Sequence, residues 1–268
     1  SMDDLNRASV DDVTSFFKTY YAPNNAVLTL VGDFNTNDGL AKVKKYFDNI
    51  PRQPAPPSVD MTEPVQTAER RATLEDKLAR LPEVTIAYKA VPGNTPDYYA
   101  LVVLSAALQS GQSSRLYQKL VKDTQVAQSA SGYASETRGP GALYTSVLLN
   151  RGHKTDEAEK LVYAEIERLK KEPIADWELE KAKNFTKRQL VSSIQNSLSA
   201  AILIGQYTVF YNEPNLVNTR IDKITAVTKD DVQRVANKYL KETNRTVVVT
   251  LPKGSGPTAA ADKQGGAR

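Results

Sequence analysis

The sequence lacks the residues from which most recognisable active sites are built. Its 268 residues include no cysteine and a single histidine, His153. The absence of cysteine excludes disulfides, thiolate zinc sites and cysteine nucleophiles. A catalytic zinc ion usually takes about three protein ligands that are mostly His or Cys, and this composition cannot supply them. We therefore predict no metal site and no catalytic residue within this chain.

The common catalytic and nucleotide-binding motifs are absent as well. A Ser-His-Asp triad could use only His153, which lies between an apolar run and a predicted helix start, and we interpret it as a solvated loop residue. The sequence contains no G-x-S-x-G elbow, no P-loop and no G-x-G-x-x-G fingerprint. The residues alone therefore show no recognisable active site.

Long apolar runs and long basic runs are also missing. No stretch approaches the about 18 consecutive apolar residues of a membrane-spanning helix, so we expect no membrane span. Lys plus Arg number 35 against 31 Asp plus Glu, and no basic run exceeds two or three residues. Nucleic acid is therefore not an expected partner. The hydrophobic content of 40% and charged content of 25% predict a folded protein of one or two domains.

The sequence repeats one segment near its two ends. Residues 9–31, the first-copy segment, match residues 228–250, the second-copy segment, with a constant offset of 219 residues, as from Ser9 to Thr228. Each copy predicts a capped helix, a turn asparagine and a buried strand, the first strand at 26–31. We interpret the match as a tandem duplication; the alternative is a generic helix–turn–strand unit used twice. The matched pairs are Ser9 and Thr228, Asp11 and Asp230, Asp12 and Asp231, Val13 and Val232, Tyr20 and Tyr239, and Asn25 and Asn244.

The duplication and a proline-rich stretch divide the chain into four predicted parts. Residues 1–50 are the C-terminal remnant of a first copy, and 51–69 form a semi-rigid linker with four prolines in the seven residues from Pro51 to Pro57. Residues 70–251 form a complete second domain. The Gly-, Ala- and Lys-rich residues 252–268 predict a disordered tail.

The predicted second domain groups its strands in hairpins and its helices in runs. Strands are expected at 84–90, 126–135 and 142–149, the last two joined by the turn Arg138-Gly139-Pro140-Gly141. Helices are expected near 97–108, 115–121, 155–169 and 176–194, with more helix to about 211. This order predicts an α+β fold with an antiparallel sheet that is covered on one face by helices.

Three segments resemble the pitrilysin/insulinase family of zinc metallopeptidases, the inverzincins. The stretch Tyr20–Leu28 with Gly32-Asp33-Phe34 resembles the end of that family's first domain. Residues 114–121 and 244–249 look like its second, non-catalytic domain, which has the fold of mitochondrial processing peptidase domains. The resemblance covers roughly residues 1–252 and implies a tandem-domain architecture, as the duplication does.

The resemblance also implies where the missing chemistry belongs. The family binds zinc with an H-x-x-E-H helix motif and a more distant Glu, and the motif glutamate is the general base. None of these residues is present here. By family order the motif lies upstream of Ser1, so we expect a C-terminal fragment whose first partner is the upstream catalytic domain, with zinc in the parent protein and none in this chain.

The resemblance implies a small set of substrate-chamber positions: Arg115, Val121 and Gln128. Many relatives place an Arg, and a Tyr seven residues later, against the substrate backbone. The corresponding positions here are Val121 and Gln128, so the spacing is kept but the donors are not. In two-subunit relatives a homologous partner chain carries that pair, and we therefore expect such a heterodimer.

Two functions follow from the resemblance. In the first, the chain is the non-catalytic lobe of a zinc peptidase and walls the chamber that encloses peptides or unfolded protein. In the second, it is a structural subunit without peptidase activity, like the core subunits of respiratory complexes with this fold. We favour the peptidase lobe and, by resemblance to bacterial relatives, a periplasmic location.

Overall fold

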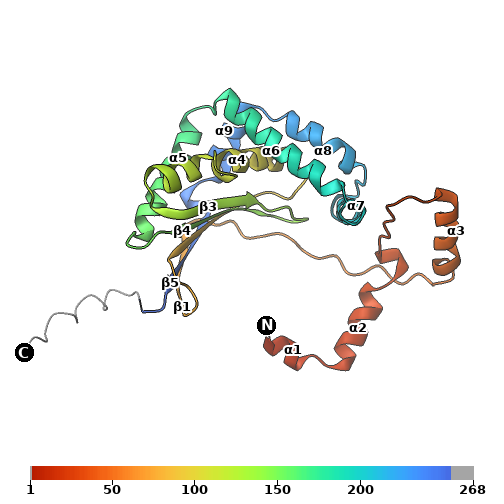
Figure 1. The fold of residues 1–268 in the computed structure, drawn as a ribbon. Helices are drawn as coiled ribbons and strands as arrows, with labels where there is room; N and C mark the ends of the chain where they lie inside the picture. Colours follow the sequence, from red (N-terminus) through yellow and green to blue (C-terminus); the bar gives the residue numbers. More distant parts are fainter. Residues whose placement is uncertain (1, 255–268) are drawn as a thin grey trace, which may run out of the picture. The chain divides into compact units, whose positions relative to one another are not determined.

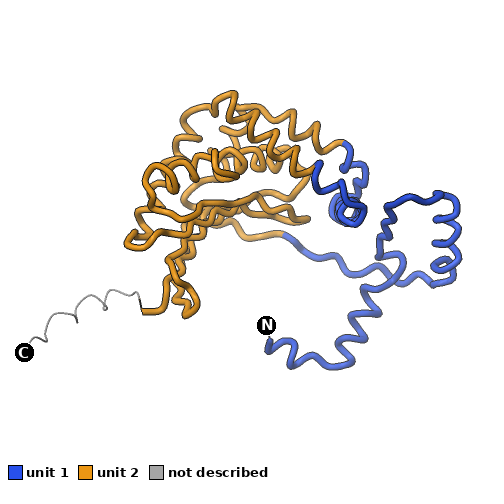
Figure 2. Tube along the Cα trace, viewed as in Figure 1, with its two compact units in different colours: residues 1–61, 191–218 blue, residues 62–190, 219–268 orange. Residues whose placement is uncertain are grey.

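The computed structural model describes residues 2–254, which form two compact units (Figure 2). The first unit comprises the chain up to residue 61 together with residues 191–218. The second comprises residues 62–190 and the chain from residue 219 onward. The domain boundaries expected at 50, 69 and 251 stay predictions. The expected disordered tail lies outside the described residues from residue 255 onward.

The second unit contains a five-stranded mixed sheet. Its spatial order is β1-β5-β2-β4-β3, in which β5 lies between β1 and β2. The β2–β4, β2–β5 and β3–β4 pairs are antiparallel, whereas β1 pairs with β5 in parallel. A parallel pair is possible there because no short turn connects these two strands. The strands are β1 (Arg70–Asp76), β2 (Glu83–Lys89), β3 (Ala127–Ala134), β4 (Ala142–Leu149) and β5 (Arg245–Pro252).

Helices cover one face of this sheet, as Figure 1 shows. The residues of β2 alternate between buried and half-buried, so that Val84, Ile86 and Tyr88 point into the core. Ile86 lies opposite Val247 of β5 in the register. The other face carries the half-buried partners of the same strands. The predicted α+β fold with a sheet covered on one face is therefore confirmed, with the parallel edge pair as the one departure from an antiparallel sheet.

The helices of the second unit follow the predicted order, with α8 as an addition. Because α4 is apolar on nearly all sides, most of its residues are buried. The short helix expected near 115–121 is a π-helix, in which Thr124 N–H donates to the carbonyl of Lys119. Helix α8 was not predicted, since its sequence is short and rich in polar residues. The helices are α4 (Pro96–Gln109), η2 (Tyr117–Asp123), α5 (Thr155–Lys171), α6 (Asp176–Ile194), α8 (Leu216–Thr225) and α9 (Lys229–Tyr239).

Asp97 ties the start of α4 to the end of α9. Its carboxylate accepts hydrogen bonds from Arg234 (2.5 Å), Lys238 (2.7 Å) and the Tyr239 hydroxyl (2.5 Å). Burial opposes the charged form, but these three donors outweigh it and hold the pKa of Asp97 well below its usual range. The ionised carboxylate therefore stabilises the contact between the two helices.

We expect Asp97→Asn to lower stability at neutral pH, by an amount that shrinks gradually as the pH falls below about 4. A depressed pKa contributes stability above the unfolded value of about 3.9, and that contribution is lost as the pH falls through the folded value. Because Arg234 and Lys238 are about half exposed, solvent screening limits the loss at pH 7 to about 1–2 kcal/mol. Urea unfolding at pH 7 and pH 3 measures both values. An equal loss at the two pH values would contradict this account.

The first unit consists of helices joined by extended chain. Its helices are α1 (Met2–Arg7), α2 (Val10–Tyr20), η1 (Pro23–Asn25), α3 (Thr36–Phe47) and α7 (Ser197–Tyr211). The prediction of a strand at 26–31 is wrong. Ala26 has an extended backbone, but the segment has no pairing partner among the described residues. A strand requires a neighbour for its backbone groups. Within residues 2–254, no helix is long and apolar enough to cross a lipid bilayer.

Candidate functional site

The duplicated segments begin with the same capping structure. In α2, the Ser9 hydroxyl accepts a hydrogen bond from the Asp12 N–H (3.2 Å), and the Asp12 carboxylate accepts one from the Ser9 N–H (2.9 Å). In α9, Thr228 and Asp231 make the same reciprocal pair, at 3.1 Å for both bonds. This capping box satisfies N–H groups that a helix start leaves without partners. The predicted helix of the repeat is therefore present in both copies.

The two segments also end alike. The Asn25 side-chain amide donates to the carbonyl of Tyr20 (2.8 Å), and Asn244 donates to the carbonyl of Tyr239 (2.7 Å). A single 3₁₀ turn precedes the extended residues in each case. The turn of the repeat is thus present in both copies, whereas only the second copy goes on to form a paired strand, β5.

The two copies differ sharply in burial. Six large side chains of the first copy are each at least 50% exposed, while their six counterparts are each at most 5% exposed. The exposed positions are Val13, Phe16, Phe17, Tyr21, Leu28 and Leu30; the buried ones are Val232, Val235, Ala236, Leu240, Val247 and Val249. We call the six exposed side chains the uncovered face. In the second copy the same positions contact a sheet and two helices, α4 and α5.

The first unit also contains an apolar groove beside the uncovered face. It has a volume of about 630 Å³ and lies between the extended segment, with Leu28 and Leu30, and the helix α3, with Val43 and Phe47. An apolar groove next to exposed aromatic side chains is typical of a surface that another polypeptide covers. The duplication indicates what that polypeptide resembles, because the second copy shows the same segment with its neighbours in place.

Arg115 is committed to an internal ion pair. Its guanidinium donates to both carboxylate oxygens of Glu178 in α6, at 2.7 and 2.8 Å, and the side chains are 8% and 10% exposed. Glu178 also accepts from the Ala175 N–H (3.1 Å), which caps the start of α6. The bond from Arg115, opposed by burial, lowers the pKa of Glu178. Among the described residues, the remaining Nη1 of Arg115 has no hydrogen-bond partner.

Val121 and Gln128 lie in different surroundings. Val121, in η2, packs against the hydrophobic core. Gln128 is exposed at a break in the β3–β4 register, where Ala127 pairs with Leu149 and Ser129 with Leu148. Gln128 is therefore the extra residue of a β-bulge, an irregularity that re-aims side chains. The structure does not bring the three expected chamber residues into one cluster, and their chamber role stays a prediction.

Gln128 lines a groove at the end of the sheet, which we call the sheet-end groove. It has a volume of about 540 Å³, and its lining includes Asp76, Arg80, Glu83, Gln128, Leu148 and Arg151. Sequence reasoning missed Arg80 and Arg151. The signal that could have found them is their position, because each lies within three residues of a strand end and the β2–β4 register places those ends together.

The described residues offer no metal centre. No group of three His, Cys, Asp or Glu side chains between residues 2 and 254 could hold a metal ion. The imidazole of His153 lies beside Glu157, with its Nδ1 3.1 Å from the carboxylate. One imidazole beside one carboxylate does not meet the needs of zinc, so these residues do not fit a zinc ion.

The sequence profile of a family described as the peptidase M16 inactive domain matches residues 7–185. The chain belongs to the peptidase M16 family. The zinc protease PqqE of Helicobacter pylori is 30% identical to this M16 chain over 253 residues, which make up 94% of the chain and 57% of that protein. The chain therefore spans little more than half of this relative. The resemblance inferred from the sequence is confirmed.

Solved structures support the same assignment. The crystal structure of a protease from Helicobacter pylori has a TM-score of 0.87 and 30% identity, and the match covers 94% of this M16 chain and 61% of that one. A chain of complex III2 from Candida albicans has a TM-score of 0.79 at 17% identity, covering 93% and 60%, which shows a shared fold alone. The chain is thus an inactive domain related to zinc proteases.

Proposed function

We propose that this M16 chain is the non-catalytic lobe of a zinc peptidase and forms a wall of the chamber that encloses peptides or unfolded protein. The observation that carries the proposal is the uncovered face. Its second-copy counterparts are buried against a sheet and two helices, so the first copy needs a similar preceding half-domain. In the proposed parent, that half-domain carries the zinc and the general base.

The residues at the expected chamber positions support a complex in which another chain supplies the groups that bind the substrate backbone. Val121 packs against the core and has no polar group to bind a substrate, and Gln128 offers an amide in place of a phenol. A homologous partner subunit would then supply the Arg and Tyr donors, and the complex would act in the periplasm. The substrate would be a peptide held in extended form.

A structural role is the second candidate. The likeness to a chain of complex III2 favours it, because the same fold occurs in that complex. The two candidates differ in what precedes this chain in the parent protein. A zinc-binding helix there supports the peptidase lobe, and its absence supports the structural subunit.

The test compares this chain with the proposed longer protein. We expect the 268-residue chain to retain no stoichiometric zinc after dialysis and to cleave no peptide, because its residues cannot build the site. The longer protein, with its partner subunit, should hold one zinc per catalytic domain and cleave an unstructured peptide. A chelator should abolish that cleavage. A tightly folded protein of the same composition should resist it.

Two results would contradict the proposal. One zinc bound tightly by the 268-residue chain would show that we have misjudged its residues. A longer protein that holds no zinc and cleaves no peptide, with or without a partner, would leave the structural role.

A further inference from the structure

The sheet-end groove contains two arginines that the protein itself does not pair. Arg80 and Arg151 make no hydrogen bond or ion pair with any described residue. Elsewhere in the second unit, Arg71, Arg115, Arg220 and Arg245 each pair with a glutamate. Arg80 and Arg151 therefore differ from these four arginines, and both line the same groove.

The sheet fixes where these arginines lie. Arg151 follows the end of β4, and Arg80 lies in the loop between β1 and β2. The Leu149 N–H donates to the carbonyl of Pro82 (2.9 Å), which holds that loop against the end of β4. Glu83 pairs with Leu148 in the register, so the floor of the groove consists of strand residues. Because paired strands form this floor, Arg80 and Arg151 both border the same groove.

The acidic residues of the groove are already engaged. The Asp76 carboxylate accepts a hydrogen bond from the Leu78 N–H (2.8 Å), and the Glu83 carboxylate accepts one from the Ser146 hydroxyl. Neither carboxylate forms an ion pair with an arginine of the groove. The guanidinium groups of Arg80 and Arg151 are therefore available to bind a ligand. A guanidinium binds a carboxylate well because its planar N–H donors match the two carboxylate oxygens.

Gln128 adds a neutral polar group to the same groove. As the extra residue of the bulge, it is released from the strict alternation of β3, and its side chain is exposed. A primary amide can accept a hydrogen bond from a peptide N–H and donate one to a peptide carbonyl. It therefore suits the backbone that adjoins a terminal carboxylate.

We propose that the sheet-end groove binds a carboxylate of an extended peptide, with Arg80 and Arg151 pairing the carboxylate and Gln128 contacting the adjacent backbone. The volume of about 540 Å³ accommodates a few residues of peptide. This inference rests on the proposed function, since it takes the ligand to be a peptide in the chamber. The carboxylate can come from the chain terminus or from an acidic side chain.

Three fluorescein-labelled hexapeptides distinguish these sources when their binding to the full chain is measured by anisotropy at low salt. The first ends in a free carboxylate, the second in an amide, and the third in an amide but with an internal Glu. We expect the free-acid peptide to bind about fivefold more tightly than the plain amide, an advantage that salt weakens. An equal gain for the Glu peptide would assign the site to side-chain carboxylates.

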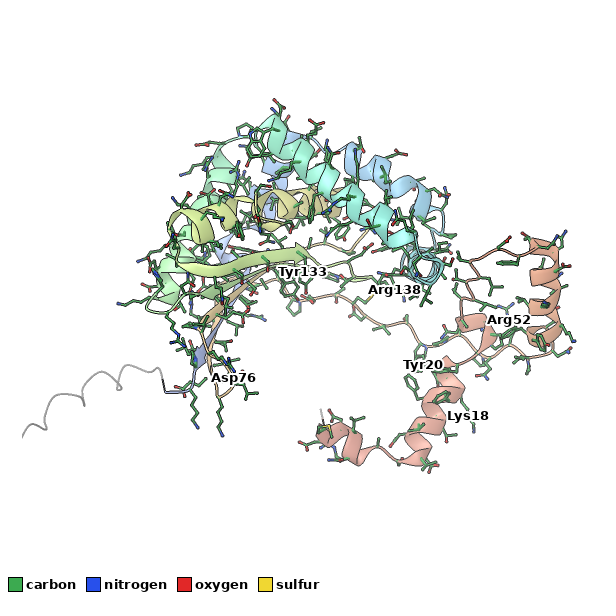
Figure 3. The ribbon with its side chains drawn as sticks, viewed as in Figure 1. Lys18, Tyr20, Arg52, Asp76, Tyr133 and Arg138 are labelled. Atoms are coloured by element: carbon green, nitrogen blue, oxygen red, sulfur yellow. The ribbon has the colours of Figure 1, made fainter. Side chains whose placement is uncertain are left out.

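The variant R80A/R151A should lose the preference for a carboxylate while its melting temperature stays unchanged, because both side chains are exposed. The matched control is R52A/R138A, which removes the same charge. Figure 3 labels Arg52 in the first unit and Arg138 in the β3–β4 hairpin, at the opposite end of those strands from Gln128. The control should keep the preference.

Three outcomes would contradict the proposed carboxylate site in the sheet-end groove. Equal binding of all three peptides would exclude carboxylate recognition but leave the chamber-wall role intact. A preference that persists in R80A/R151A, or that R52A/R138A also loses, would show that net charge attracts the peptide. Binding of none of the peptides would overturn both the groove and the peptide-binding role.

Discussion

Val232→Asp should unfold the second unit, while the same substitution at Val13 should leave the stability unchanged. The two valines occupy equivalent positions, each preceded by two aspartates in a capped helix. Val232 is fully buried, whereas Val13 is 51% exposed. An unpaired carboxylate in the core costs about 4 kcal/mol or more, and an exposed substitution changes stability by about 0.5 kcal/mol or less.

Urea unfolding followed by circular dichroism measures both variants against the parent chain. Because the capping box and the two preceding aspartates are the same in both helices, the direct effect of the substitution on the helix start is similar in the two variants. In the proposed longer protein, Val13→Asp should become as costly as Val232→Asp. A large loss from Val13→Asp in the 268-residue chain would show that the first copy is already covered, and would contradict the structure.

Arg115→Ala should destabilise the second unit by about 3–5 kcal/mol, because it leaves the buried carboxylate of Glu178 without its partner. In the parent chain, the bond from Arg115 lowers the pKa of Glu178. Its contribution to stability is therefore present above the unfolded pKa and is lost as the pH falls. Without Arg115, burial raises that pKa, and the deficit of the variant should widen as the pH rises from about 4 to 7.

The double variant Arg115→Met, Glu178→Leu serves as the control for this prediction. It removes both charges and keeps the volume, so it should recover most of the lost stability. Unfolding curves at pH 4 and pH 7 for the single and double variants are the measurement. If the double variant is as unstable as Arg115→Ala, the loss comes from packing and not from the uncompensated carboxylate.

Local signals in the sequence predicted the parts of the fold that depend on near neighbours. Ser9 and Thr228 begin their helices as predicted, because a capping box involves residues three apart. The turn around Gly139 joins β3 and β4 as predicted. These features need no knowledge of the rest of the chain.

The features that escaped prediction depend on residues far apart in the sequence. The placement of β5 between β1 and β2 joins residues about 175 positions apart. The partner of Arg115 is Glu178, 63 residues away. The expected strand at 26–31 failed for a similar reason, since strand formation depends on a neighbour that the described residues do not provide. The sequence alone also does not show that Arg80 and Arg151 line the same groove, because this follows from the pairing of β2 with β4.

Two similar segments in one chain can cause misfolding, because one segment can pack into the site of the other. The second-copy site holds Val235 and Ala236, both fully buried. The first copy places Phe16 and Phe17 at those positions. Two phenyl groups cannot enter a space filled by a valine and an alanine without strain.

The strand residues give a second barrier to such cross-pairing. In the second copy, Arg245 binds Glu69 and lies over the ring of Tyr163, 4.0 Å from its centroid. The first copy has Ala26 at that position. An intruding first-copy segment would leave Glu69 with only Arg71 as its ion-pair partner. The sequence differences between the two copies thus disfavour exchange of one segment for the other during folding.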